Sequence, residues 1–326
     1  MISFIIPAYN CDAYIRQCIE SILFQGDPDF EVIIIDDGSN DGTSAIIEEY
    51  VKKDSRVRFF HVENGGPARA RNIGLDNAIG DWVIFVDADD WVDLDFLAKL
   101  DLRNKNNIPD IIFWGFKRCY ENSHVEVCAP KDYHVATDKM CISAQLVYLL
   151  ESDDEFFGYS VNKIYKRSII EEANIRFCKG LSFREDELFA LQYCSHITSS
   201  MILSQVPYNY RIIDSSLSHD VAIKFRNHFL LASKECAILS LFEHTTFHEA
   251  LARRIFKYYL AAITECLYLK RCELMTVIRE SLSFYDKYNS CLILPLWQKI
   301  IMTFPIKTLR DKLIVLLFKI RLKLKF

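Results

Sequence analysis

Acidic and polar residues gather in three short segments of the first hundred residues, each directly after an apolar run. The segments are Pro7-Ala8-Tyr9-Asn10, Asp36-Asp37-Gly38-Ser39 and Asp87-Ala88-Asp89-Asp90. A single acidic turn is explained by turn chemistry alone, because Asp, Asn and Gly suit tight turns and helix caps. Three such segments at consecutive strand ends indicate instead one polar site that uses these groups together.

The third segment places two carboxylates where like charges are costly. Asp87 and Asp89 follow the apolar run from Val83 to Val86, and carboxylates in such surroundings repel one another unless a cation neutralises them. Mn²⁺ and Mg²⁺ prefer oxygen ligands, commonly one or two protein carboxylates together with substrate phosphates. The spacing therefore predicts a site for Mn²⁺ or Mg²⁺ at Asp87 and Asp89, which a phosphorylated ligand completes.

Other motifs fit these loops less well. The stretch from Asp37 to Glu48 nearly has the spacing of an EF-hand calcium loop, but an EF-hand needs an incoming helix and Val32 to Ile35 is a β-branched run of strand length. A dinucleotide-binding fold is disfavoured because the turn after the first strand lacks G-x-G-x-x-G. The sequence also has no Walker motif, nucleophile elbow or H-E-x-x-H motif.

The elements that must position these loops are strands alternating with helices. Apolar, β-rich runs predict strands at Ile2 to Pro7, Val32 to Ile35, Val57 to Val62 and Trp82 to Val86. Apolar residues at helical spacing predict helices at Ala13 to Phe24, Thr43 to Lys53 and Ala68 to Ile79. This alternation predicts an α/β fold with a mostly parallel sheet, in which ligands bind outside the carboxyl ends of the strands.

The remaining chain is mixed and then helical. Strands are expected at Ile111 to Phe116 and Tyr208 to Arg211, and helices at Ala144 to Leu150 and Leu188 to Cys194. We expect three parts. They are a catalytic domain at 1–219, with its nucleotide-binding half at 1–100 and its acceptor side at 101–219, a helical appendage at 220–288, and a basic amphipathic tail at 289–326.

Five motifs in order and at matching spacing resemble the inverting family 2 glycosyltransferases, which have the GT-A fold. The motifs are Pro7-Ala8-Tyr9-Asn10, Asp36-Asp37-Gly38-Ser39-x-Asp41-Gly42-Thr43, Asn64-Gly65-Gly66, Ala70-Arg71-Asn72 and Asp87-Ala88-Asp89-Asp90-Trp91. The resemblance is strong over residues 1–100 and extends more weakly through Asn162-Lys163-x-Tyr165 and Glu185-Asp186 to Tyr210-Arg211 and Ser216. It implies metal-assisted transfer of a sugar from a nucleotide diphosphate sugar, with UDP favoured, to a glycan hydroxyl in cell-surface polysaccharide biosynthesis.

The resemblance also implies roles for single residues. Asp89 would be the chief metal ligand, and Asp87 would hold the ribose or the metal shell. Asp37 would hydrogen-bond the base. The nucleotide-binding residues that it implies are Pro7, Ala8, Tyr9, Asp37, Asn64, Gly65, Arg71, Asp87 and Ala88.

Two later segments complete the implied site. The Glu185-Asp186 pair resembles the late acidic motif of the family, so Asp186 is expected to be the catalytic base. Acidic residues before Leu188 would equally suit the start of a helix, where negative charge favours the positive end of the helix dipole. Arg211 and Ser216 are expected to contact the donor phosphates. His219 is expected as a third metal ligand, with a surface position at a helix start as the alternative.

Composition sets further limits. The formal net charge of −5 argues against nucleic acid as the main partner. Residues 287–326 carry +8 in an amphipathic pattern, which predicts either contact with the inner face of the plasma membrane or a helix pair that packs on this domain or a second subunit. The eleven scattered cysteines predict reduced thiols. With no signal segment and no apolar run of about 18 residues, we expect a cytoplasmic protein, and peripheral contact with the inner face of the plasma membrane stays open.

Two rival functions remain to be weighed. A sugar-nucleotide pyrophosphorylase would show a Gly-rich basic loop after the first strand, which Pro7 to Asp12 does not supply. A non-catalytic glycan-binding or scaffold protein of the same fold would not need Asp87, Asp89 and Asp186 together. The expected partners are therefore a nucleotide-sugar donor and a glycan or lipid-linked glycan acceptor, with a homo-oligomer left open. The donor sugar, the acceptor and the linkage do not follow from these motifs.

Overall fold

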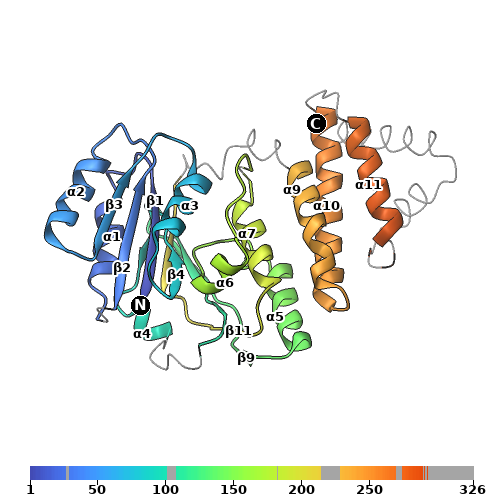
Figure 1. Cartoon of the computed structure of the whole chain (residues 1–326), viewed down its shortest axis with the longest axis horizontal. Coiled ribbons are helices and arrows are strands. Elements are labelled where there is room, and N and C mark those ends of the chain that lie inside the picture. Colours follow the sequence, from blue (N-terminus) through green and yellow to red (C-terminus); the bar gives the residue numbers. More distant parts are fainter. Residues whose placement is uncertain are drawn as a thin grey trace. The chain divides into compact units, whose positions relative to one another are not determined.

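The computed structural model describes residues 1–26, 29–100, 108–181, 183–213, 228–268, 274–288, 290 and 292. These residues form two compact units (Figure 1). The first contains the described residues of 1–180 and 184–213, and the second contains 181, 183 and the described residues from 228 onward. Ser216, a predicted phosphate contact, and His219, a predicted metal ligand, lie outside the described residues. So does the basic tail apart from residues 290 and 292.

Eight strands form the main sheet of the first unit, in the order β3-β2-β1-β4-β10-β6-β11-β9. Its first half is parallel and consists of β1 (Ile2–Ala8), β2 (Phe30–Asp36), β3 (Val57–His61) and β4 (Trp82–Phe85). Its second half consists of β10 (Lys163–Lys166), β6 (Ile111–Phe113), β11 (Ser200–Ile202) and β9 (Tyr133–Ala136). β10 runs antiparallel to both β4 and β6, so its first residues lie beside the carboxyl end of β4.

Three helices connect the parallel strands, namely α1 (Ile15–Leu23), α2 (Thr43–Lys53) and α3 (Pro67–Asn77). α1 buries Ile15, Cys18, Ile19 and Ile22, as the helical spacing of these residues predicts. α3 lies against β1 and β2. A Cβ atom at Gly74 would collide with Ile5, so glycine allows the close approach of this helix to the sheet.

A second sheet has four strands in the order β5-β12-β7-β8. They are β5 (Trp91–Val92), β12 (Tyr208–Ile212), β7 (Phe116–Tyr120) and β8 (Val125–Cys128). The first unit also contains α4 (Phe96–Leu100), α5 (Lys139–Glu151), α6 (Arg167–Glu172) and α7 (Glu185–Cys194). β12 pairs with β5, which directly follows the acidic turn at Asp87, and it thereby ties residue 208 to that turn.

The core behind the sheet edge is aromatic. Phe177 and Phe189 stack with their ring centroids 4.2 Å apart, and Phe85 meets them edge-on at 5.2 and 5.7 Å. Offset stacking and edge-to-face contacts are the favoured arrangements of such rings. The guanidinium carbon of Arg71 lies 5.4 Å from the centroid of Phe177, so this cluster supports a charged group of the sheet edge.

The predicted α/β fold is confirmed. Each element predicted within residues 1–100 is found with limits within two residues of those expected. The prediction of one continuous strand at 111–116 was wrong. There the chain forms two strands, β6 and β7, in different sheets, and they are separated by the buried Trp114 and by Gly115. The short elements β10, α6 and β11 were not anticipated, because runs of three to six residues carry little periodic signal.

The second unit is helical where it is described. It contains α9 (His228–Leu239), the 3₁₀-helix η2 (Ser240–Phe242), α10 (Thr246–Tyr268) and α11 (Leu274–Tyr288). α10 packs against both α9 and α11, and it lies between them in Figure 1. Phe256 of α10 stacks with Phe284 of α11 at 6.5 Å. Of the helices in the described ranges, none is both long enough and apolar enough to cross a membrane.

Candidate active site

The three polar segments meet at one edge of the main sheet. β1, β2 and β4 are parallel, so their carboxyl ends lie side by side. The Asp37 backbone N–H donates to the Ala8 carbonyl oxygen at 2.8 Å, and the Val86 N–H donates to the Ile5 carbonyl at 3.0 Å. Because β10 is antiparallel to β4, the residues just before β10 reach the same edge.

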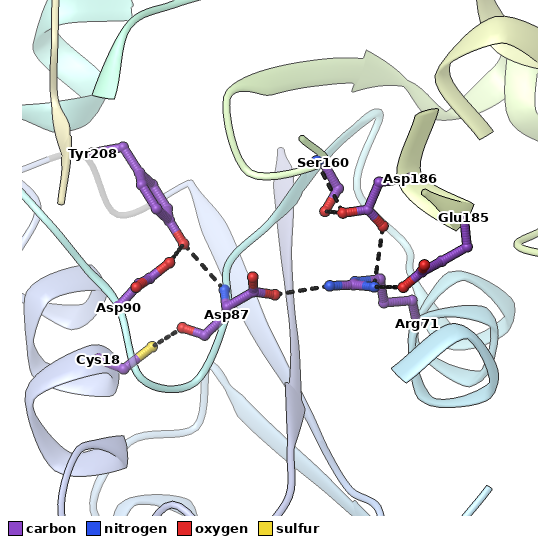
Figure 2. A network of polar contacts seen from close by, with 8 residues as sticks. All are labelled: Cys18, Arg71, Asp87, Asp90, Ser160, Glu185, Asp186 and Tyr208. Atoms are coloured by element: carbon purple, nitrogen blue, oxygen red, sulfur yellow. Dashed lines mark hydrogen bonds and ion pairs between the residues drawn. The ribbon is translucent and has the colours of Figure 1, made fainter. Parts of the chain in front are cut away.

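Arg71 lies at the centre of the polar network (Figure 2). One terminal nitrogen, Nη2, lies 2.9 Å from Asp87 Oδ1, and the other, Nη1, lies 3.1 Å from Asp186 Oδ1 and 3.5 Å from Glu185 Oε1. Burial alone would lower the pKa of Arg71, but the charges of these three carboxylates raise it, so the guanidinium stays charged. The arginine therefore joins the acidic turn after β4 to the first turn of α7.

One guanidinium does not neutralise three carboxylates. Burial raises the pKa of Glu185 to about 7, and the neighbouring charge of Asp186 adds to the shift. Burial also raises the pKa of Asp87, against the opposing charge of Arg71. The site therefore has an excess of negative charge, which further positive charge would stabilise.

α7 begins at Glu185, so Glu185 and Asp186 occupy the start of a helix. This agrees with the alternative given above, in which acidic residues suit the positive end of the helix dipole. The same residues nevertheless contact Arg71. Arg184, directly before them, has a left-handed backbone with φ of 55°. This conformation is uncommon for a non-glycine residue, and ion pairs from Arg184 to Glu155 and Glu187 hold the side chain there.

The two aspartates at the end of the acidic turn differ in their surroundings. Asp90 is buried and accepts hydrogen bonds from the Tyr208 hydroxyl at 2.6 Å and from the Arg211 backbone N–H at 2.7 Å. Asp90 thus anchors β12 to the turn. Asp89 is half-buried, and within the described ranges no other residue donates a hydrogen bond to its carboxylate. Burial raises the pKa of Asp89 to about 6, with a further contribution from Asp87.

These carboxylates fit a hard divalent ion. Among the described residues, no other residue donates a hydrogen bond to the Asp89 carboxylate, and the ion pair of Asp87 with Arg71 is made by Oδ1, so carboxylate oxygens of both residues could serve as ligands. Across the described residues, no group of three or more His, Cys, Asp or Glu could hold a metal ion. Mg²⁺ and similar ions are commonly bound through one or two carboxylates with substrate phosphates as further ligands.

The second polar segment is tied to the loop that follows β3. Asp37 Oδ1 accepts from the Gly65 N–H at 2.9 Å and Oδ2 accepts from the Gly66 N–H at 2.7 Å, while the Asn64 side chain donates to the Asp37 carbonyl at 3.0 Å. Gly38 has φ of +78°, and a Cβ atom there would lie 2.9 Å from the Asn64 nitrogen. The predicted nucleotide residues Asp37, Asn64 and Gly65 therefore form one structural unit.

The first polar segment presents an aromatic ring to solvent. Tyr9 is 49% exposed, whereas Ala8 and Ala88 are buried and Pro7 is half-buried. Asn10 has a left-handed backbone, donates its N–H to Ser39 Oγ and accepts the Asn40 N–H, each at 2.9 Å. These hydrogen bonds connect the loop after β1 to the loop after β2.

Arg211 is held in place by its neighbours. Its guanidinium carbon lies 4.8 Å from the ring centroid of Tyr14 and 4.6 Å from that of Trp91. Its Nε donates to the Asp89 carbonyl and its Nη2 to Gln17 Oε1, both at 2.7 Å. Arg211 is thus brought to the acidic turn, where its positive charge lies near Asp89.

A family model described as glycosyl transferase family 2 matches residues 3–173. The chain belongs to glycosyltransferase family 2. It is therefore a glycosyltransferase, as the motifs at the sheet edge indicated.

Curated relatives of this family 2 glycosyltransferase include two proteins of Bacillus subtilis. The uncharacterized glycosyltransferase EpsJ is 31% identical over 247 residues, which cover 71% of each chain. The putative glycosyltransferase EpsH is 31% identical over 66% of this chain and 62% of its own. The poly(ribitol-phosphate) beta-N-acetylglucosaminyltransferase TarS of Staphylococcus aureus is 28% identical over 64% of this chain, but the match spans only 35% of TarS.

Solved structures of similar fold agree with this membership. Residues 1–349 of S. aureus TarS, in complex with UDP-GlcNAc, superpose with a TM-score of 0.71 at 19% identity, over 96% of this chain and 89% of that one. A mannosyltransferase from Pyrobaculum calidifontis gives a TM-score of 0.53 at 15% identity, over 89% and 82% of the two chains. At these identities the likeness concerns the fold, and the GT-A fold expected for family 2 is confirmed.

Several contacts of the family 2 site were not anticipated from the sequence. Ser160 donates to Asp186, Tyr208 donates to Asp90, and Gln17 accepts from Arg211. Ser160 lies two residues before the Asn162-Lys163-x-Tyr165 motif, which is the one sequence signal close to it. Tyr208 and Gln17 lie in regular elements, and their types carry no such signal.

Proposed function

We propose that this enzyme transfers a sugar with inversion from a nucleoside diphosphate sugar to a hydroxyl of a glycan. The observation that carries the proposal is that Arg71 contacts both Asp87 and Asp186, at 2.9 and 3.1 Å. A carboxylate of the donor side and a carboxylate suited to the acceptor side therefore flank one buried guanidinium. An inverting transfer needs such a pairing of leaving-group stabilisation with a base on the opposite side.

Asp186 is the proposed general base. It accepts the proton of the acceptor hydroxyl while that oxygen forms a bond to the anomeric carbon. The bond from the anomeric carbon to the diphosphate oxygen breaks on the opposite face, and its electron pair leaves with the diphosphate. General base catalysis of this kind contributes roughly 10² to 10⁴-fold to a rate.

Asp89, with Asp87 beside it, would hold Mn²⁺ or Mg²⁺. When bound, the ion supplies positive charge that stabilises the leaving diphosphate. Support comes from the half-buried, unpaired carboxylate of Asp89 and from the raised pKa values of Asp87 and Asp89. His219 stays a prediction for a third ligand.

The nucleotide is proposed to be UDP. The TarS structure was obtained with UDP-GlcNAc, and the Pyrobaculum mannosyltransferase with GDP-Man and Mn²⁺. A nucleoside diphosphate is the chemistry that both share, and the higher fold similarity to TarS favours UDP. Tyr9, with its exposed ring, would pack on the nucleoside together with Pro7 and Ala8, and Arg211 with Ser216 would contact the phosphates.

The acceptor is proposed to be a glycan of the cell surface or a lipid-linked precursor of one. TarS is named for its action on poly(ribitol phosphate), which supports a polymer acceptor by analogy. The basic tail at 289–326 would bring the enzyme to an anionic membrane surface, where a lipid-linked acceptor lies.

The test is turnover of UDP-sugars with Mn²⁺ in the parent, Asp89→Ala and Asp186→Asn proteins. We expect Asp89→Ala to lose metal-dependent donor binding and turnover, and Asp186→Asn to keep donor binding and lose transfer. Asp81→Asn, which removes an exposed carboxylate outside the site, is the control and should match the parent. Equal turnover in all of these proteins would overturn the proposal.

A further inference from the structure

Ser160 is a fully buried serine that contacts the proposed base (Figure 2). Its backbone N–H lies 3.2 Å and its Oγ 2.8 Å from Asp186 Oδ2. The other oxygen, Oδ1, accepts from Arg71 Nη1 at 3.1 Å. Three donors from two separate segments therefore hold the Asp186 carboxylate in one orientation.

The two oxygens of this carboxylate are not equivalent. A carboxylate oxygen has two lone-pair sites. Both sites of Oδ2 are used by Ser160, whereas Oδ1 has one donor, Arg71, among the residues that the structure describes. The Asp186 side chain is 19% exposed, but Ser160 has no exposed surface, so an acceptor hydroxyl can reach Asp186 and not Ser160.

Two buried side chains at the start of β10 fix the segment that presents Ser160. Lys163 Nζ donates to the carbonyl oxygens of Phe156, at 3.1 Å, and of Tyr159, and to Asn162 Oδ1 at 2.6 Å. The Asn162 amide donates to the same Phe156 carbonyl at 2.9 Å. These bonds give the Asn162-Lys163 motif a structural role, which is to hold the segment that carries Ser160.

We propose that Ser160 is a positioning residue of the transfer reaction, which holds Asp186 Oδ2 so that Oδ1 receives the acceptor proton. The proposal rests on the role proposed for Asp186. The proton passes from the acceptor hydroxyl to Asp186 Oδ1, and the Ser160 hydroxyl keeps its own proton throughout. Ser160 acts through Asp186 and touches no substrate.

The test is Ser160→Ala, which removes the Oγ donor and leaves the backbone donor. We expect kcat for transfer to fall about 10- to 100-fold, the rate equivalent of one hydrogen bond to a charged group. Donor affinity should stay within about twofold, because the donor side of the site is intact. The acid limb of the pH profile of kcat should move to higher pH, since the charged carboxylate loses a donor.

The pH readout separates positioning from loss of fold. The titratable and charged groups of the described residues that face Asp186 are Arg71 from α3, Asp87 after β4, Lys163 and Tyr165 of β10, and Glu185 of α7. Ser160→Ala alters none of them. Ser160→Thr keeps the hydroxyl and should keep the pH profile of the parent. Ser200→Ala removes another fully buried serine, which donates to Gln145 at 2.8 Å, and should leave kcat and the profile unchanged.

An unchanged kcat and pH profile in Ser160→Ala would overturn the proposal. An equal loss of kcat in the Ser200→Ala control would do the same, because the effect would then be one of general stability. Full transfer activity of Asp186→Asn would overturn the proposed function itself. The Asp186 and Ser160 variants therefore report on the two proposals separately.

Discussion

At the scale of single residues, Arg71 changes the interpretation of the site. The family resemblance implied that Arg71 belongs to a nucleotide pocket, and the sequence analysis assigned the neutralisation of Asp87 to a metal ion. In the structure the guanidinium itself pairs with Asp87 and Asp186. Removing one partner of a buried ion pair commonly costs about 3–5 kcal/mol, because the other charge is left without compensation. Arg71 therefore stabilises the two acidic segments of the site as well as linking them.

Glu185 predicts a pH dependence of stability. Its pKa is raised to about 7 by burial and by the charge of Asp186, above its ordinary value of 4.5. The folded protein then binds the proton more tightly than the unfolded chain does, so this contribution to stability is present below pH 4.5 and is lost as the pH rises through 7. In metal-free protein, Glu185→Gln should show a smaller fall in Tm between pH 5 and pH 7.5 than the parent.

Thermal unfolding of the two proteins at both pH values measures this difference. Glu63→Gln, which removes an exposed glutamate that lies outside this cluster, should keep the pH dependence of the parent. The same fall in Tm for Glu185→Gln as for the parent would show that Glu185 does not hold a proton in the folded state near neutral pH.

At the scale of secondary structure, the loops after β1, β2 and β3 hold one another in place through hydrogen bonds. The Asp37 carboxylate bonds the backbone of Gly65 and Gly66, and Asn10 bonds the loop at Ser39 and Asn40. The polar residues at the strand ends therefore serve two purposes. They form the mouth of the site, and they satisfy the backbone groups of tight turns that would otherwise lack partners.

Asp37→Ala should weaken nucleotide binding without removing the fold. The change deletes both acceptors of the Gly65 and Gly66 N–H groups and releases the turn that carries Asn64. Each lost hydrogen bond to a charged group costs about 1.5–3 kcal/mol, so we expect a clear fall in the free energy of unfolding and at least a tenfold weaker Kd for UDP. Calorimetric titration of UDP and denaturant unfolding measure the two effects.

Asp76→Ala is the matched control, because it removes an aspartate whose ion pair with Arg176 lies at the surface. Its effect on UDP binding should be negligible, and its effect on unfolding should be below about 1 kcal/mol. If Asp37→Ala binds UDP as tightly as the control, the turn at Gly65 takes no part in the nucleotide site.

At the scale of the whole molecule, charge is unevenly distributed. Residues 287–326 carry +8, so the 286 residues before them carry −13. The acidic residues 1–286 would be repelled by an anionic membrane, while each basic residue near the surface contributes around 1 kcal/mol of attraction. We therefore propose that the basic tail at 289–326 attaches and orients the enzyme at an anionic membrane surface.

Deletion of residues 290–326 should abolish binding to vesicles that contain anionic lipid and should leave donor turnover in solution unchanged. Co-sedimentation with phosphatidylserine vesicles measures binding, and neutral phosphatidylcholine vesicles are the control. Replacing Lys319, Arg321, Lys323 and Lys325 by glutamine tests charge alone and should weaken binding in the same direction. Unchanged sedimentation of the deleted protein would favour the alternative, in which the tail packs on protein.

The structure bears out the sequence most fully in residues 1–100. There the β-branched runs and the helical spacing of apolar residues define strands and helices over short distances. Because consecutive βα units form parallel strands, the polar segments after β1, β2 and β4 had to meet at one edge. Elements of three or four residues, such as β10 and β11, were not predicted. They form because they pair with neighbouring strands in the tertiary structure, and local propensity contributes little.

The sequence by itself determined that the polar segments after β1, β2 and β4 lie at one end of the parallel strands, since local periodicity and the parallel arrangement are enough for that. It did not reveal Ser160, Tyr208 or Gln17. Only the tertiary structure decided the mutual contacts of the site residues. Arg71 and Asp186 lie 115 residues apart in the chain, and Ser160 reaches Asp186 because β10 enters the sheet antiparallel to β4. Such pairings depend on the packing of distant segments, which no local pattern of residues encodes.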